Sequence, residues 1–236
     1  MFELIAFDAD DTLWQNERLY ARAQEKLRGL LSSYCESAEI DRQLYNTELR
    51  NLEHYGYGIK SFALSMIETA IQLTGGRITG GDIQKILAAV QEMLLADVEL
   101  LEHAQDTVAN LSTSYTLMLV TKGDLLDQQR KIQGSGLGGY FKYIEIVSEK
   151  DSKNYLALLE KYGVAPQHFL MVGNSLKSDV FPVTAIGGQA VHIPYELTWE
   201  HENEVDASIT GSNYYQLEHL GQLPGLIEQI ASSMGN

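Results

Sequence analysis

An α/β fold with a parallel sheet is the class that this sequence of 236 residues predicts. Two observations support the prediction. Short apolar runs alternate with helical segments in the second half of the chain, which is typical of strands joined by helical crossovers. The first apolar run is separated from the others by a long stretch with helical spacing alone. We therefore expect an α/β core that contains an all-helical insertion.

Three of the expected strands are short apolar runs that end in polar residues, at 4–7, 115–120 and 169–172. Further strands are expected at 143–147 and 190–193. A strand that is apolar at every position is typical of a parallel sheet covered on both faces. Helices are expected between these strands, including residues 152–162, and another near the end of the chain at residues 223–230.

Residues 15–101 are expected to form the all-helical insertion. Apolar side chains recur there at the three- and four-residue spacing of a helix, as at Leu19, Ala23 and Leu27. Glycine pairs divide the stretch into four or five helices. The α/β core then consists of residues 1–14 and 102–236.

Composition limits the partners that this chain can bind. It has 17 lysines and arginines against 32 aspartates and glutamates, a formal net charge of −15 that repels nucleic acid and anionic lipid. No apolar run approaches the roughly 18 residues that cross a bilayer, and the start of the sequence lacks the features of a signal peptide. Its single cysteine, Cys35, is typical of a reducing compartment. We expect a cytoplasmic protein without nucleic-acid or membrane partners.

Polar residues follow the expected strands at their carboxyl ends, where open α/β sheets bind ligands. Asp8 and Asp10 follow the first strand. Two carboxylates this close repel each other unless a cation lies between them or one is protonated. The pair suits a metal-bound nucleophile with a separate proton donor, although a solvated acidic turn is the alternative interpretation.

Lysines and a hydroxyl mark the next two strand ends. Thr121 and Lys122 follow the strand at 115–120, where a hydroxyl and successive main-chain amides can hold phosphate oxygens. Lys150 follows the strand at 143–147 and can neutralise a phosphoryl group or Asp8, with Lys153 as the alternative lysine. Taken singly, these residues also fit an ordinary turn and a solvent-exposed lysine.

Gly173, Asn174 and Asp179 follow the strand at 169–172. The glycine allows a sharp turn, and the amide and carboxylate oxygens are ligands that suit Mg²⁺. A helix N-cap formed by Asn174 or Ser175 is the alternative interpretation, with Asp179 favourable in the first turns of that helix.

In their order along the chain, these residues resemble the four motifs of the haloacid dehalogenase superfamily. The motifs are Phe7-Asp8-Ala9-Asp10-Asp11-Thr12-Leu13, then Thr121, Lys150 and Gly173-Asn174 with Asp179. The resemblance covers the whole chain and implies a Rossmann-like core with the helical insertion as a C1-type cap. Two positions depart from the pattern: Asn174 replaces the usual aspartate, and Asp151 follows the lysine where proline is frequent.

The resemblance implies a phosphatase that uses Mg²⁺ to hydrolyse a small phosphomonoester. Asp8 would be the nucleophile that forms an aspartyl-phosphate, and Asp10 would protonate the leaving oxygen and then activate water. The phosphoryl oxygens would be held by Thr121, Lys122 and Lys150. The ligands of Mg²⁺ would be Asp8, Asp10, Asn174 and Asp179.

Asp10 favours a phosphatase over a dehalogenase, because the leaving alkoxide of an ester needs a proton and dehalogenases lack this second aspartate. A phosphomutase, a haloacid dehalogenase and a non-catalytic binding protein on the same fold stay open as alternatives. The expected partner is a small phosphorylated metabolite, and the protein is expected to be a monomer or a homodimer. Candidates for substrate specificity are Trp14, Asn16, Glu17, Tyr55, Tyr57 and Lys60.

Overall fold

The structure is a computed structural model that describes residues 2–197, 199–203 and 214–234. Within it the chain divides into two compact units. The first unit comprises Met1–Glu17, Val98–Thr121 and Lys131–Asn236. The second comprises Arg18–Asp97 and Lys122–Arg130.

A six-stranded sheet forms the centre of the first unit, in the order β3-β2-β1-β4-β5-β6. The strands are β1 (Leu4–Phe7), β2 (Leu117–Lys122), β3 (Tyr143–Val147), β4 (Phe169–Gly173), β5 (Gln189–His192) and β6 (Tyr215–Gln216). Strand β1 pairs in parallel with both β2 and β4, and the pairs β4–β5 and β5–β6 are parallel as well. The predicted α/β class with a parallel-sheet core is therefore confirmed.

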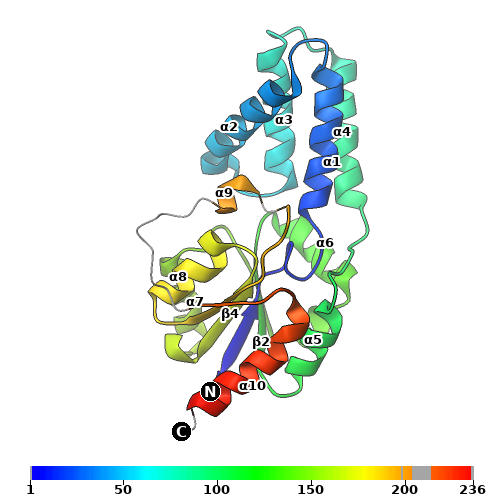
Figure 1. The fold of residues 1–236 in the computed structure, drawn as a ribbon. Coiled ribbons are helices and arrows are strands. Elements are labelled where there is room, and N and C mark those ends of the chain that lie inside the picture. Colours follow the sequence, from blue (N-terminus) through cyan, green and yellow to red (C-terminus); the bar gives the residue numbers. More distant parts are fainter. Residues whose placement is uncertain (1, 198, 204–213, 235–236) are drawn as a thin grey trace. The chain divides into compact units, whose positions relative to one another are not determined.

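Helices cover both faces of this sheet. Side chains alternate along β1, so Ile5 and Phe7 pack in one layer while Leu4 and Ala6 pack in the other. The first layer includes α5 (Ala104–Ser112) and α10 (Leu223–Met234), which lie side by side in Figure 1. The second includes α7 (Ser152–Tyr162) and α8 (Phe181–Ala185). Burial on both faces explains why β1 and β4 contain no polar side chain, whereas β3, which includes Glu145, is only partly buried.

Short elements complete the first unit. Single-turn 3₁₀ helices lie at Gly138–Tyr140, Pro166–His168 and Leu220–Gln222. A π-helical turn at Leu176–Val180 follows β4, and the short helix α9 spans Glu200–Asn203. Helix α6 (Leu125–Ser135) is shared, since its first six residues belong to the second unit.

The second unit is helical. Its main elements are α1 (Glu17–Leu31), α2 (Ser37–Tyr55), α3 (Ile59–Leu73) and α4 (Gly80–Leu95). The buried side chains recur at helical spacing, for example Ala23, Leu27 and Leu31 on α1, and they form a separate apolar core. Helix α4 begins after Thr79, whose hydroxyl accepts a hydrogen bond from the main-chain N–H of Asp82.

Several details differ from the sequence prediction. Strand β2 begins and ends two residues later than expected, because its pairing with β1 starts at Leu117 and its polar end, Thr121 and Lys122, stays extended. Helix α5 was not predicted. Residues 122–130 group with the helical unit and 98–101 with the sheet; the assignment of residues 15–101 as a cap stays a prediction. Among the helices described here, none is both long and apolar enough to cross a membrane.

Candidate active site

A tight loop after β1 holds the first two candidate residues. The main-chain N–H of Asp8 still donates to a carbonyl of β4, at 2.9 Å, so this residue is fixed to the sheet. Asp11 adopts the left-handed conformation with φ of 59°. Its carboxylate accepts hydrogen bonds from the main-chain N–H groups of Asn16 (2.9 Å) and Glu17 (3.1 Å). These bonds close the loop on itself and fix the backbone around Asp10.

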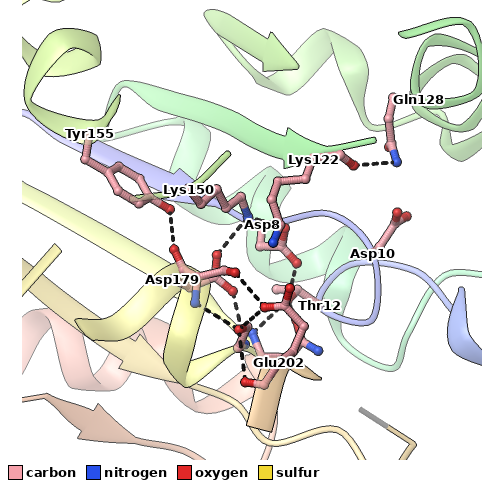
Figure 2. A network of polar contacts seen from close by, with 12 residues as sticks. Asp8, Asp10, Thr12, Lys122, Gln128, Lys150, Tyr155, Asp179 and Glu202 are labelled. Atoms are coloured by element: carbon pink, nitrogen blue, oxygen red, sulfur yellow. Dashed lines mark hydrogen bonds and ion pairs between the residues drawn. The ribbon is translucent and has the colours of Figure 1, made fainter. Parts of the chain in front are cut away.

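Lys150 joins two buried carboxylates at the carboxyl end of the sheet (Figure 2). Its Nζ lies 2.5 Å from Asp8 Oδ1 and 2.7 Å from Asp179 Oδ1. The three side chains are buried, with 2%, 10% and 1% of the Lys150, Asp8 and Asp179 side-chain surfaces exposed. The alternative lysine, Lys153, is exposed on α7. Lys150 is thus the lysine that contacts Asp8.

Burial and charge oppose each other in this group. Burial raises the pKa of Asp8 to about 7, Lys150 acts to lower it, and Asp179 adds to the rise. Burial alone would lower the pKa of Lys150, but Asp179 and Asp8 together raise it above its ordinary value. Lys150 is therefore a fixed positive charge between two carboxylates, and it compensates one of their two negative charges.

Thr12, which Figure 2 shows beside Asp8, extends the network to Asn174. The Thr12 hydroxyl lies 3.0 Å from Asp8 Oδ2 and 3.2 Å from Asn174 Oδ1, and it accepts a hydrogen bond from the Asn174 main-chain N–H at 3.1 Å. The main-chain carbonyl oxygen of Asn174 lies 3.0 Å from Nε2 of His192, a residue that is itself buried. Thr12 therefore links the loop after β1 to the loop after β4.

Gly173 makes room for Asp179. A Cβ atom on Gly173 would lie 2.2 Å from Asp179 Oδ2 and 2.7 Å from Asp179 Cβ, both far below van der Waals contact. The carboxylate fills this space and accepts a hydrogen bond from the main-chain N–H of Ser175 at 3.1 Å. The glycine in this motif is required for the close approach of the carboxylate.

We expect Gly173→Ala to displace Asp179 and to lower the free energy of unfolding by about 1–3 kcal/mol, the usual cost of overpacking. Urea unfolding measures the change. Gly139→Ala is the matched control, because a Cβ there meets no atom within 4 Å, and we expect its effect to stay within about 0.5 kcal/mol. Equal stabilities for the two variants would contradict the prediction.

Asp10 lies in a different environment from Asp8, and in Figure 2 its side chain points away from the Asp8–Lys150–Asp179 group. Lys131 Nζ contacts both Asp10 carboxylate oxygens, at 2.8 and 2.7 Å. The indole N–H of Trp14 donates to Asp10 Oδ1 at 2.6 Å. The Asp10 carboxylate is therefore held in one orientation by two donors.

Lys131 was not singled out in the sequence. It lies in the second turn of α6, and its Nζ also donates to Asn16 Oδ1 at 3.1 Å. A lysine on a polar helix face is an ordinary feature, and Asp10 is 121 positions away, so no local pattern indicates the contact. The structure reveals a positive charge at Asp10 that the motifs do not contain.

The two candidates at the end of β2 have different surroundings. Thr121 is almost fully buried, and the pairing of Leu119 with Phe7 places it at the same edge of the sheet as Asp8. Lys122 groups with the helical unit, where its Nζ lies 4.0 Å from the centre of the Tyr57 ring. The main-chain carbonyl of Lys122 accepts a hydrogen bond from Gln128 Nε2 at 3.0 Å.

The specificity candidates fall into two groups. In the first unit, Trp14 is fully buried and its indole is bound to Asp10, so its position differs from that expected of a side chain open to a ligand. Asn16 is buried and Glu17 is half-buried. In the helical unit, Tyr55 is 56% exposed, Tyr57 contacts Lys122, and Lys60 Nζ is 3.0 Å from Asp124 Oδ2.

The donor atoms around Asp8 suit a hard divalent cation. Asp8 and Asp179 supply carboxylate oxygens, Asn174 supplies an amide oxygen, and Lys150 compensates only one of the two negative charges. In the part of the chain that the structure describes, no group of three or more His, Cys, Asp and Glu side chains is placed to hold a metal ion, so the set near Asp8 has two carboxylates and an amide. Two carboxylates and one amide oxygen fit Mg²⁺, because this ion keeps several water ligands and binds few carboxylates.

A parallel sheet with a buried aspartate–lysine pair at the carboxyl end of its central strand defines an enzyme of the α/β class with a carboxylate-based site. The family model of haloacid dehalogenase-like hydrolases matches residues 2–185, and the chain belongs to this family. The predicted family and the predicted hydrolase class are confirmed.

Relatives with assigned activities match nearly the full length of this chain. The N-acylneuraminate-9-phosphatase of Mus musculus is 25% identical over 245 residues, which covers 96% of this chain and 94% of the mouse protein. The glyceraldehyde 3-phosphate phosphatase of Pyrococcus furiosus is 23% identical over 245 residues, which covers 99% of this chain and 95% of the archaeal protein.

Solved structures show the same fold. A haloacid dehalogenase-like family hydrolase from Xanthomonas campestris is 37% identical, with a TM-score of 0.88 over 99% of this chain and 94% of that chain. A 2-haloacid dehalogenase from Pseudomonas syringae is 19% identical, with a TM-score of 0.63 over 97% of this chain and 99% of that chain. At this lower identity the likeness concerns the fold alone.

Proposed function

We propose that this protein is a cytoplasmic, Mg²⁺-dependent phosphatase that hydrolyses a small phosphomonoester through an aspartyl-phosphate. The observation that carries the proposal is the separation of two neighbouring aspartates into different environments. Asp8 lies with Lys150 and Asp179, whereas Asp10 lies with Lys131 and Trp14. One carboxylate can therefore act on phosphorus while the other handles the proton.

The first step is attack of an Asp8 carboxylate oxygen on phosphorus, which breaks the bond from phosphorus to the ester oxygen. Asp10 gives its proton to that leaving oxygen, and the alcohol departs. In the second step Asp10 takes a proton from water, whose oxygen attacks phosphorus. The bond from phosphorus to Asp8 breaks, and inorganic phosphate and both aspartates are restored.

Positive charge and hydrogen-bond donors support both steps. Lys150, fixed between its two carboxylates, stabilises charge on the phosphoryl oxygens, and Thr121 and Lys122 are proposed to hold those oxygens at the end of β2. Asp8, Asp179, Asn174 and the main-chain carbonyl of Asp10 are the proposed Mg²⁺ ligands. When bound there, Mg²⁺ supplies positive charge to a phosphoryl oxygen and orients it for attack.

The relatives support a small substrate. Both activities named for them, N-acylneuraminate-9-phosphatase and glyceraldehyde 3-phosphate phosphatase, belong to phosphatases of small phosphorylated compounds. We also propose that residues 15–101 act as a cap that excludes bulk water during phosphoryl transfer. The residues proposed to select the substrate are Asn16, Glu17, Tyr55, Tyr57 and Lys60.

A haloacid dehalogenase is the second candidate, since dehalogenases share the fold. The presence of Asp10 favours the phosphatase, because halide leaves without a proton. A phosphomutase would use the same first step and return the phosphoryl group to a sugar instead of to water.

The test is release of inorganic phosphate from a panel of sugar phosphates, sugar-acid phosphates and triose phosphates, with and without Mg²⁺. We expect turnover of at least one ester that requires Mg²⁺. Chloride release from 2-chloropropionate is measured in parallel, and chloride release without phosphate release would replace the phosphatase by a dehalogenase. Transfer of phosphate between sugar positions, without free phosphate, would indicate the mutase.

Lys131→Met is expected to lower kcat about 10–100-fold, because a hydrogen bond to a charged group contributes about 1.5–3 kcal/mol. Without the lysine, Asp10 loses the donor that contacts both of its oxygens. Steady-state kinetics on the best ester of the panel checks this, with Arg130→Met, an exposed neighbour on the same helix, as the control. An unchanged kcat in Lys131→Met would refute a role at Asp10.

A further inference from the structure

Helix α9 is bound to the π-helical turn that follows β4. Oε2 of Glu202 accepts hydrogen bonds from the Ser175 and Ser178 hydroxyls, both at 2.5 Å. Lys177 Nζ lies 2.9 Å from Nε2 of His201, the residue before Glu202. Figure 2 shows the Glu202 side chain reaching the polar network that contains Asp179. Contacts of two kinds therefore join α9 to this turn.

The two serines belong to the part of the chain that carries the proposed metal ligands. Ser175 follows Asn174 directly, and its main-chain N–H donates to Asp179 Oδ2 at 3.1 Å. Its hydroxyl also accepts a hydrogen bond from the main-chain N–H of Ser178 at 3.0 Å. The Glu202 carboxylate is therefore hydrogen-bonded directly to Ser175, the residue whose main-chain N–H orients Asp179.

This turn needs support from outside. Single π-helical turns are rare and are frequently found at functional sites. Ser175 and Ser178 are each only 5% exposed, and a buried hydroxyl without an acceptor is costly. A carboxylate that accepts both hydroxyls forms charge-assisted bonds, which are stronger than neutral ones.

We propose that Glu202 is a positioning residue that fixes the turn from Ser175 to Asp179 and thereby sets the affinity of the site for Mg²⁺. The inference rests on the proposed function only in taking Mg²⁺ as the cation. Glu202 lies outside the four motifs, 23 positions beyond Asp179 in the sequence. It acts on the metal ligands through the two serines, without contacting a reacting atom.

The experiment is calorimetric titration of the full-length protein with MgCl₂ alone. We expect Glu202→Ala to weaken Mg²⁺ binding about 10–100-fold, the usual effect of removing a group that orients metal ligands. Glu202→Gln keeps an oxygen that can accept both hydroxyls, so it should retain most of the affinity. Ser178→Ala removes one of the two bonds and should give an intermediate loss. Glu228→Ala, an exposed glutamate of α10, is the matched control.

Two further readouts separate positioning from general damage. Hydrogen exchange of the Asp179 main-chain N–H, which donates to the Ser175 carbonyl at 2.9 Å, should become faster in Glu202→Ala. On an ester that the enzyme hydrolyses, the Mg²⁺ concentration for half-maximal rate should rise by the factor seen in calorimetry, while kcat at saturating Mg²⁺ changes little.

Three results would overturn the inference. They are Mg²⁺ affinity in Glu202→Ala equal to that of the wild type, affinity in Glu202→Gln as weak as in Glu202→Ala, and a wild-type protein that does not bind Mg²⁺. The second result would mean that Glu202 acts by its charge and not by holding the hydroxyls. If the wild type binds Mg²⁺ but hydrolyses no ester, the proposed function fails, and calorimetry still decides the role of Glu202.

Discussion

Asp8→Asn is expected to reduce phosphate release about 10⁴-fold or more, the size of effect seen when a member of a catalytic group is removed. The amide oxygen of asparagine cannot act as the nucleophile, so no aspartyl-phosphate forms. The protein should stay folded, because Lys150 keeps its 2.7 Å contact with Asp179 and one of two negative charges around a single ammonium is removed. Phosphate release at saturating Mg²⁺ is the measurement.

The control for this variant is Asp106→Asn, an exposed aspartate in the first turn of α5. We expect it to keep the wild-type rate. Urea unfolding of Asp8→Asn establishes that the loss of rate is not a loss of fold. A rate within tenfold of the wild type in well-folded Asp8→Asn would exclude Asp8 as the nucleophile.

Lys150→Met is expected to have the largest effect on stability, a decrease in the free energy of unfolding of about 3–5 kcal/mol. The change removes the ammonium from between Asp8 and Asp179 and leaves two buried carboxylates facing each other. Urea unfolding without Mg²⁺ measures the decrease. Added Mg²⁺ should restore part of the lost stability, because a cation bound by the same oxygens replaces some of the missing charge.

Lys153→Met is the matched control, since this lysine lies three positions away and is exposed. Its effect should stay within about 0.5 kcal/mol. The double variant Lys150→Met/Asp8→Asn should be more stable than Lys150→Met, because one of the two facing charges is gone. Equal stability of Lys150→Met and Lys153→Met would show that the pairs to Asp8 and Asp179 contribute nothing.

Much of the fold was predictable because the central strands of the sheet are buried on both faces. The apolar run at 4–7 coincides with β1, the run at 169–172 lies within β4, and both strands are fully buried. Other elements left no pattern. Strand β6 has two residues, too few for any periodicity, and α5 was missed because small and polar residues dilute its apolar positions.

The candidate residues near strand ends were predictable from the sequence, whereas those that helices contribute were not. The sequence indicated Asp8, Lys150 and Asp179, because each directly follows or lies near the end of an apolar run, and the structure brings these three together. Lys131 contacts Asp10, which is 121 positions away in the sequence, and Glu202 contacts Ser175 and Ser178 at the π-helical turn. Such contacts depend on tertiary packing, which the local spacing of residues does not predict.

The central position of β1 has a consequence for biosynthesis. This strand is synthesised before its neighbours, residues 117–122 and 169–173, and the four helices from Glu17 to Leu95 are made in between. Helices form from local contacts and fold quickly, whereas pairings between distant strands form slowly. The nascent chain therefore carries Leu4–Phe7 without its partner β2 until residue 122 has been added, and without its partner β4 until residue 173 has been added. During that time an apolar strand with open edges is available to chaperones or to aggregation.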